Sequence, residues 1–166
     1  MKKINIFIIS LLLLIVFPVS INADSSLEAE RMNVDIKVSE TGLMTIVQEI
    51  DMNFKTPHRG IFAFIPQKYY DFEYKGKKMD ILMPISNVEL LTDDPYEVDD
   101  NGDGVVIRIG DPDTFIEGRK TYKYQYNIQL YNWTGNDEDI FYFDVVADKW
   151  EFPIKHVDFT LTLPQE

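Results

Sequence analysis

The amino-acid sequence predicts an all-β fold: an antiparallel β-sandwich of immunoglobulin-like general architecture, preceded by a signal-peptide helix. Three observations lead to this prediction. Apolar and polar residues alternate with a period of two in several short segments, turn-forming residues separate these segments about every 8 to 12 residues, and no stretch keeps helical spacing for more than about ten residues. The chain of 166 residues is long enough for one domain with a hydrophobic core.

The first residues have the composition of a secretory signal peptide. A short basic start precedes an apolar run over 4–19, and Ala23 is a small residue where a signal peptidase would cut. We predict a signal peptide of residues 1–23, cleaved after Ala23, and one exported domain of residues 24–166. The alternative is an uncleaved membrane anchor, which needs roughly 18 or more uninterrupted apolar residues. Pro18 breaks the run before that length.

The composition limits the functions open to the chain. The net charge is -12 at pH 7, and removal of a leader with two lysines and no acid makes it -14. An acidic surface disfavours nucleic acid and anionic lipid as partners, because both need clustered Lys and Arg. The sequence has no cysteine, which excludes disulfides, thiol catalysis and a lipid on an N-terminal cysteine. Exported proteins without cysteine are typical of bacteria, so we interpret the glycosylation sequon at Asn132 as coincidental.

The first half of the domain predicts a hairpin and a short apolar strand. Residues 32–38 and 44–54 both alternate, and Gly42 between them can adopt the positive φ of a tight turn. Residues 60–66 form an apolar run closed by a proline, which predicts a short strand at a sheet margin. Residues 67–80 show no firm period, so we predict a long loop with at most a distorted edge strand.

The second half predicts further short strands. Residues 81–91 are strand-like but interrupted by Pro84, and 93–103 are acidic and rich in turn formers. Alternation returns over 105–109 and again over 157–163, which we predict as the last strand.

The centre of the predicted core is a hairpin over 118–150. Its first arm alternates and places three tyrosines on one face: Tyr122, Tyr124 and Tyr126. The second arm, 140–147, is almost entirely apolar and is predicted to lie deeper than the first. Trp150 follows a polar pair at the end of this arm, and we interpret it as a cap on the core in preference to a ligand platform.

Four segments carry a resemblance to a known family. They are Gly60-Ile61-Phe62-Ala63-Phe64-Ile65-Pro66, the Ile109-Gly110-Asp111 step, Gly118 with Thr121, Tyr122 and Tyr126, and Trp150 with Pro153, Ile154, Leu163 and Pro164. In this order and spacing they resemble the domain of unknown function 2207 family of predicted bacterial membrane proteins, over about residues 29–164. The chain departs from the family pattern at Ala63, where the family has Arg, at Phe143, where it has Trp, and at Asp144, where it has Asn.

The resemblance implies a domain order but no reaction. Members of the family are expected to carry a signal peptide, an extracytoplasmic β-rich domain, transmembrane helices and a low-complexity tail. This chain holds the first two parts and ends at Glu166 directly after a strand, so we expect a truncation before a transmembrane region that would tether the protein to the membrane. The activity of the family is unassigned.

One segment offers a candidate metal site. Asp99, Asn101 and Asp103 match the first half of a calcium loop, in which alternate oxygens converge on the ion. The twelfth position of that loop is Gly110 in place of the bidentate Glu, and Asn-Gly and Asp-Gly pairs are also typical of solvated hairpin turns. We expect no other cofactor, because two histidines about a hundred residues apart are too few for a zinc site.

These observations favour a non-enzymatic binding or scaffold module that engages a protein or glycan at the cell surface. Trp133, in the turn of the predicted 118–150 hairpin, is a candidate contact residue. The alternatives are a secreted hydrolase that acts through carboxylates and a calcium-stabilised adhesive domain. An enzyme should show convergent carboxylates in a pocket. The sequence has no Gly-x-Ser-x-Gly elbow, and its few serines are near no histidine.

Overall fold

The computed structural model describes residues 26–130 and 142–164 of the chain. This part of the protein is all-β, with ten strands and no helix. The strands are β1 (Leu27–Val38), β2 (Leu43–His58), β3 (Ile61–Pro66), β4 (Lys68–Tyr74), β5 (Lys77–Leu82), β6 (Ile85–Leu90), β7 (Tyr96–Asp100), β8 (Gly104–Ile109), β9 (Ile116–Gln129) and β10 (Val157–Thr162).

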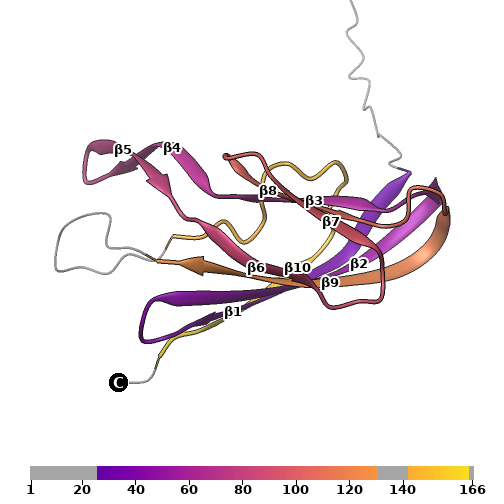
Figure 1. The fold of residues 1–166 in the computed structure, drawn as a ribbon, viewed down its shortest axis with the longest axis horizontal. Helices are drawn as coiled ribbons and strands as arrows, with labels where there is room; N and C mark the ends of the chain where they lie inside the picture. Colours follow the sequence, from indigo (N-terminus) through magenta and orange to yellow (C-terminus); the bar gives the residue numbers. More distant parts are fainter. Residues whose placement is uncertain (1–25, 131–141, 165–166) are drawn as a thin grey trace, which may run out of the picture.

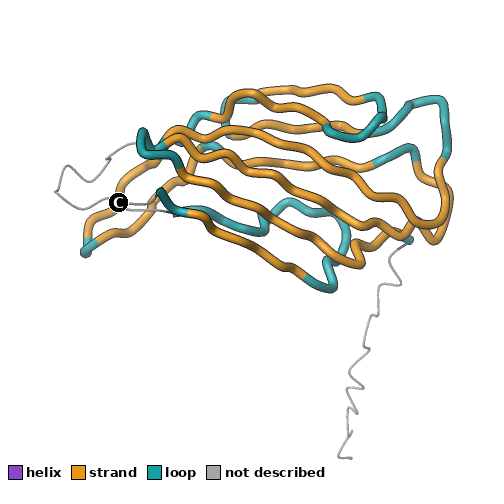
Figure 2. The backbone as a smooth tube through the Cα atoms, turned by 90° about the horizontal axis from the view of Figure 1, so that it is seen from below, coloured by secondary structure: helices purple, strands orange, loops and turns teal. Residues whose placement is uncertain are grey.

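The strands form three sheets. A five-stranded sheet has the order β10-β1-β2-β9-β6, a three-stranded sheet has the order β3-β8-β7, and β4 pairs with β5 alone. The three-stranded sheet lies over the five-stranded sheet (Figure 1), and a view from below shows the long strands running side by side along the molecule (Figure 2). The predicted all-β sandwich is confirmed. Its pairing is antiparallel except that β10 runs parallel to β1.

The core lies between the two larger sheets. The predicted alternation in β1, β2 and β9 is confirmed, and Gly42 turns the β1–β2 hairpin with a φ of 74°. Ile50 lies opposite Tyr122 in the ladder, and Ile46 lies opposite Tyr126. The three tyrosines of β9 share the buried face, as predicted: Tyr122, Tyr124 and Tyr126. Burial raises the pKa of all three hydroxyls, because water no longer stabilises the charged form.

The predicted pairing of β9 with residues 140–147 is wrong. The neighbours of β9 are β2 on one side and β6 on the other, so neither edge of β9 remains for a hairpin arm. Residues 142–147 form no strand and instead pack partly buried against the core through Tyr142, Phe143 and Val145. An apolar run without alternation favours burial but does not specify a ladder position.

Residues 67–80, predicted as a long loop with at most a distorted edge strand, and the acidic, turn-rich segment 93–103 both contain strands. Residues 67–80 hold most of the β4–β5 hairpin, whose turn has positive φ at Lys75 (49°) and Gly76 (75°). The register shifts between Tyr69 and Phe72, and this bulge removes the period of two from the sequence. The acidic segment 93–103 contains β7, which pairs with β8.

Trp150 packs against the core as expected for a cap. It is partly buried and its ring centroid lies 5.2 Å from that of Phe152. The indole Nε1 is buried and has no hydrogen-bond partner among the described residues.

Candidate functional site

The backbone before β3 and the backbone after β8 are in direct contact at one end of the sandwich, at Gly60 and Gly110. We call this contact the Gly60–Gly110 crossing. Gly60, before β3, has a φ of 142°, and Gly110, after β8, has a φ of 134°. A Cβ on Gly60 would lie 1.9 Å from the carbonyl oxygen of Ile109, and a Cβ on Gly110 would lie 2.0 Å from that of Arg59. Only glycine fits both positions. The two motifs that contain these glycines are therefore neighbours, because β3 and β8 are paired strands.

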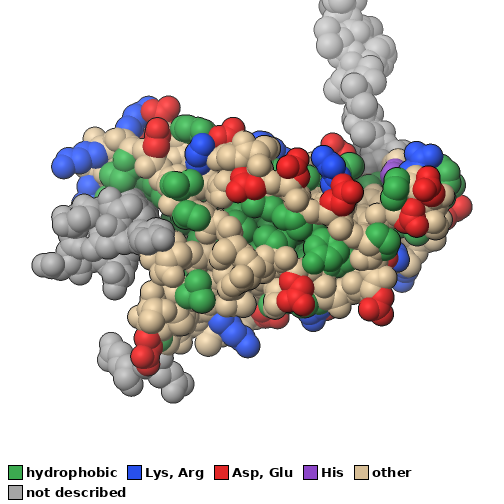
Figure 3. Space-filling view, in the orientation of Figure 1, with side chains coloured by type: hydrophobic (Ala, Val, Ile, Leu, Met, Phe, Trp, Pro, Cys, Tyr) green, Lys and Arg blue, Asp and Glu red, His purple; other side chains and the backbone are tan. Residues whose placement is uncertain are grey.

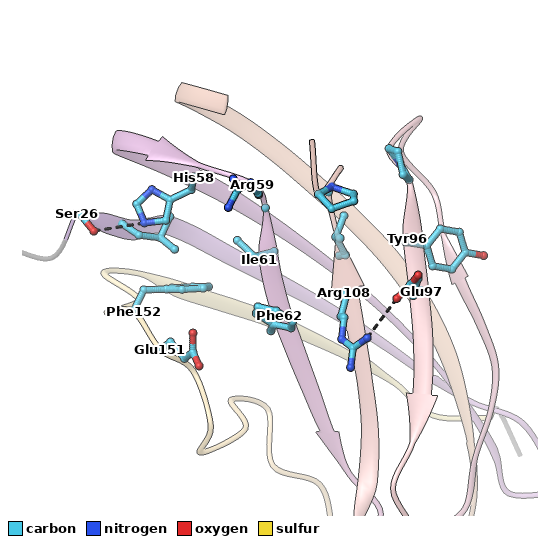
Figure 4. Close-up of a pocket in the computed structure, with 16 residues that line it drawn as sticks. Ser26, His58, Arg59, Ile61, Phe62, Tyr96, Glu97, Arg108, Glu151 and Phe152 are labelled. Atoms are coloured by element: carbon cyan, nitrogen blue, oxygen red, sulfur yellow. Dashed lines mark hydrogen bonds and ion pairs between the residues drawn. The ribbon is translucent and has the colours of Figure 1, made fainter. Parts of the chain in front are cut away.

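A cleft of about 760 Å³ lies beside this crossing. Its lining comes from the start of β1, the end of β2, the start of β3, the facing parts of β7 and β8, and the loop around residue 151 (Figure 4). The buried ring of Phe152 contributes to one wall. Two further aromatic side chains of the lining are exposed to water: Phe62 by 52% and Tyr96 by 41%. Large exposed aromatic side chains in a concave site are typical of binding surfaces.

The cleft also carries two arginines with different surroundings. The guanidinium of Arg108 lies 3.2 Å from Glu97 and 3.8 Å from Asp99. The guanidinium of Arg59 stacks over the ring of Phe115, 4.4 Å from its centroid. Both arginines are therefore held in place by neighbours, which reduces the side-chain entropy lost when a ligand binds.

The cleft brings a serine next to a histidine, contrary to the sequence interpretation. His58 Nδ1 lies 2.7 Å from the carbonyl oxygen of Thr56, so this nitrogen carries the proton and donates. His58 Nε2 then accepts from the hydroxyl of Ser26 at 3.3 Å. The serines looked remote from any histidine because these two residues are 32 positions apart in the chain.

This Ser–His pair resembles part of a nucleophile and base arrangement, but its third partner is a backbone carbonyl. A carboxylate at that place stabilises the imidazolium that forms during catalysis, and a carbonyl does so only weakly. The pair links the segment before β1 to the end of β2, and we interpret it as a structural hydrogen bond.

The described carboxylates that line the cleft are Glu97 and Glu151, and Glu97 is paired with Arg108. Among the described carboxylates, the one with a strongly shifted pKa is Glu28, which lies elsewhere, on β1. Hydrogen bonds from Lys155 and Lys55 lower the pKa of Glu28 to about 2. Such a shift identifies a structural ion cluster as readily as a catalytic group.

The predicted calcium ligands point to separate partners. Asp99 faces Arg108, Asn101 Oδ1 accepts from the backbone N–H groups of Asp103 and Gly104 at 3.1 Å each, and Asp103 Oδ1 accepts from the Tyr70 hydroxyl at 2.9 Å. Within residues 26–130 and 142–164, no group of three or more His, Cys, Asp or Glu side chains is arranged to hold a metal. Calcium binding by this turn stays a prediction.

The other candidate residues are separated from the cleft or lie outside the structure. Trp133 falls outside the described residues. His156 precedes β10 and is exposed, with Nε2 3.2 Å from Asp158. His58 is thus the histidine that reaches the cleft.

Comparisons with known proteins place the domain in a family. Residues 28–166 match the model of the Predicted membrane protein (DUF2207) N-terminal domain, and the chain belongs to this family. No curated protein matches the chain. A structure of yeast LTA4 hydrolase in complex with bestatin is similar at 9% identity and a TM-score of 0.36, covering 61% of this chain and 14% of that enzyme.

Two structural observations stand beside the family match. Ala63 of β3, within the motif on which the resemblance rests, is fully buried opposite Ile107. None of the described segments forms a helix of the length and apolarity needed to span a membrane.

Proposed function

We propose that this domain is the exported, non-enzymatic binding portion of a membrane protein, and that the cleft beside the Gly60–Gly110 crossing holds a segment of a partner protein. The observation that carries the proposal is Phe62, exposed by 52% in a concave site next to Arg108. Aromatic residues and Arg are enriched at protein interfaces, and a buried aromatic anchor commonly supplies most of the binding energy.

The surroundings of Phe62 support a protein partner. Phe62, Arg108 and Glu97 are cross-strand neighbours on one face of the three-stranded sheet, and Glu97 is already paired with Arg108. Tyr96 lines the cleft from the other face of this sheet, on the side of Ile109. The cleft volume of about 760 Å³ matches the size of sites that take a few side chains. Export and an outward orientation rest on the signal-peptide pattern at residues 1–23.

Site-specific photo-crosslinking in the cells that produce the protein tests this proposal. A photo-crosslinking amino acid replaces Phe62 in one variant, Glu151 of the same lining in a second, and the exposed Lys37 on β1 in a third, control variant. We expect Phe62 and Glu151 to give one common protein adduct, identified by mass spectrometry, that Lys37 does not give.

Three results would overturn the proposal. These are the absence of any adduct at Phe62 and Glu151, the same adduct at Lys37, and an adduct that carries glycan without protein. A cytoplasmic location of the adduct partner would overturn the outward orientation alone.

A further inference from the structure

The strand β7 is an edge strand with one free side. It pairs with β8, and no backbone hydrogen bond joins it to another strand within the described part of the chain. Two hydrogen bonds at the ends of the β7–β8 ladder show which backbone groups of β7 pair with β8. Gly110 N–H donates to Pro95 O at 2.9 Å, and Asn101 N–H donates to Gly104 O at 3.2 Å. Because antiparallel pairing uses alternate residues, Tyr96, Val98 and Asp100 direct their N–H and C=O groups to the free side.

Two of the three residues on the core-facing side of β7 are apolar but poorly covered; the third is Asp100 at the end of the strand. Tyr96 lies opposite Ile109, and Val98 lies opposite Ile107; both isoleucines are buried. Residues directly opposite each other share a face, so Tyr96 and Val98 also face the core side, yet they are 41% and 44% exposed. In Figure 3, hydrophobic side chains gather along the middle of the face between the two sheets. One more strand beside β7 would cover such side chains.

The charge around β7 selects the kind of strand that fits. The segment 93–103 carries six acids and no basic residue: Asp93, Asp94, Glu97, Asp99, Asp100 and Asp103. Among the residues that the structure describes, three cations from other elements are paired with these acids: Lys68, Arg108 and Lys120. The surroundings of the free edge stay negative, which favours a cationic strand. A second copy of this chain would place β7 acids against β7 acids, and like charges across a strand pair are unfavourable.

We propose that β7 accepts an extended segment of a partner protein as a fourth strand of the three-stranded sheet, and that this segment alternates apolar residues with Lys or Arg. The inference rests on the proposed function and names the class of partner. Main-chain hydrogen bonds to Tyr96, Val98 and Asp100 give affinity in this recognition mode, and alternate side chains give specificity. Tyr96 and Glu97 also line the cleft, so the added strand is continuous with it.

Amide hydrogen exchange with a defined peptide tests the proposal. The probe is a ten-residue peptide of alternating Lys and Val, and the matched control alternates Glu and Val. At a saturating concentration, the Lys–Val peptide is expected to slow exchange of the Tyr96, Val98 and Asp100 amides by at least about tenfold. Binding weakens with added salt, and the Glu–Val peptide has no effect.

A substitution in β7 distinguishes strand addition from a general electrostatic attraction between the peptide and the acidic surface. Val98→Pro removes an N–H that points to the free edge and leaves the ladder to β8 intact, since proline is tolerated on the open side of an edge strand. We expect it to abolish the protection, while Val98→Thr retains it. Slow exchange of the β8 amides in the free variant shows that the fold is kept. If Val98→Pro fails to fold, Glu97→Lys replaces it, with reduced Lys–Val binding expected.

The outcomes distinguish the two proposals. Unchanged β7 exchange with the Lys–Val peptide, equal protection of β10, or full binding by Val98→Pro would each overturn strand addition. If the crosslinker at Phe62 captures a protein while β7 stays unprotected, strand addition fails and the cleft proposal stands.

Discussion

Glu28 Oε1 accepts a hydrogen bond from Lys155 Nζ at 2.8 Å, across 127 residues of sequence. Lys55 Nζ lies 3.1 Å from the other carboxylate oxygen, and the amide of Asn53 donates to Oε1 at 3.2 Å. The cluster joins β1 and β2 to the segment that leads into β10, so one carboxylate links three parts of the fold.

This cluster predicts a pH-dependent stability. The pKa of Glu28 is lowered from 4.5 to about 2, so its stabilising effect is present above pH 4.5 and is lost as the pH falls from 4.5 to about 2. Glu28→Gln should lower the melting temperature at pH 7 and have little effect near pH 2, as thermal unfolding at both pH values measures. Glu40→Gln, in the exposed β1–β2 turn, is the control with no expected effect. Equal destabilisation by Glu28→Gln at both pH values would contradict the prediction.

The core tyrosines predict a stabilising substitution. The hydroxyl of Tyr124 is buried and has no hydrogen-bond partner among the described residues. Removing an unsatisfied buried polar atom should raise the free energy of unfolding, by about 1 kcal/mol for Tyr124→Phe. Urea denaturation measures the change. Tyr70→Phe is the control, because this hydroxyl is exposed and bonded to Asp103. A loss of stability in Tyr124→Phe would reveal a partner for the hydroxyl.

The Gly60–Gly110 crossing predicts that a single added methyl group greatly lowers the free energy of unfolding. Gly60→Ala and Gly110→Ala would force a Cβ onto backbone atoms, which should cost about 3 kcal/mol or more. Gly76→Ala is the matched control: its φ of 75° is also positive, but no atom lies within 4 Å, so only about 1 kcal/mol of backbone strain is expected. Denaturation midpoints of the three variants check the order. Equal costs at all three positions would contradict a steric role for the crossing.

The leader predicts a defined mature N-terminus. If residues 1–23 are a signal peptide, N-terminal sequencing of the protein from the producing cells should begin at Asp24. Replacement of Ala23 by Leu should slow cleavage, because the peptidase requires a small residue there. A mature protein that begins at Met1 would support the uncleaved anchor instead.

The turn after β7 allows a direct test of the calcium prediction. Isothermal calorimetry with millimolar calcium should give heat if Asp99, Asn101 and Asp103 bind the ion, and Asp103→Asn should reduce it. The absence of heat removes the calcium-stabilised adhesive alternative.

The sequence predicts the strands whose two faces differ in solvent exposure. Alternation identified β1, β2, β8 and most of β9, because one face of each meets the core. It failed for β4, where a bulge breaks the period, and for 142–147, which is apolar without being a strand. It also gave no direction for β10, since alternation is the same for parallel and antiparallel strands.

The cleft was not predicted because its parts are remote in the chain. Ser26 precedes β1 and His58 ends β2, and no local sequence pattern connects the two residues. The available signal was the pair of glycines, Gly60 and Gly110, each beside a buried isoleucine at the end of a short strand. Two such glycines are consistent with a close backbone approach, but only the fold shows that they meet each other.

The parallel pairing of β1 with β10 has a mechanical consequence. These strands begin and end the described chain, and six residue pairs align them from Met32–Val157 to Lys37–Thr162. Tension applied between the start of β1 and the end of β10 pulls the two strands lengthwise past each other. All the bonds between them are then loaded together in shear, whereas an antiparallel pair pulled in this way opens one bond at a time. A domain built in this way resists stretching along its length.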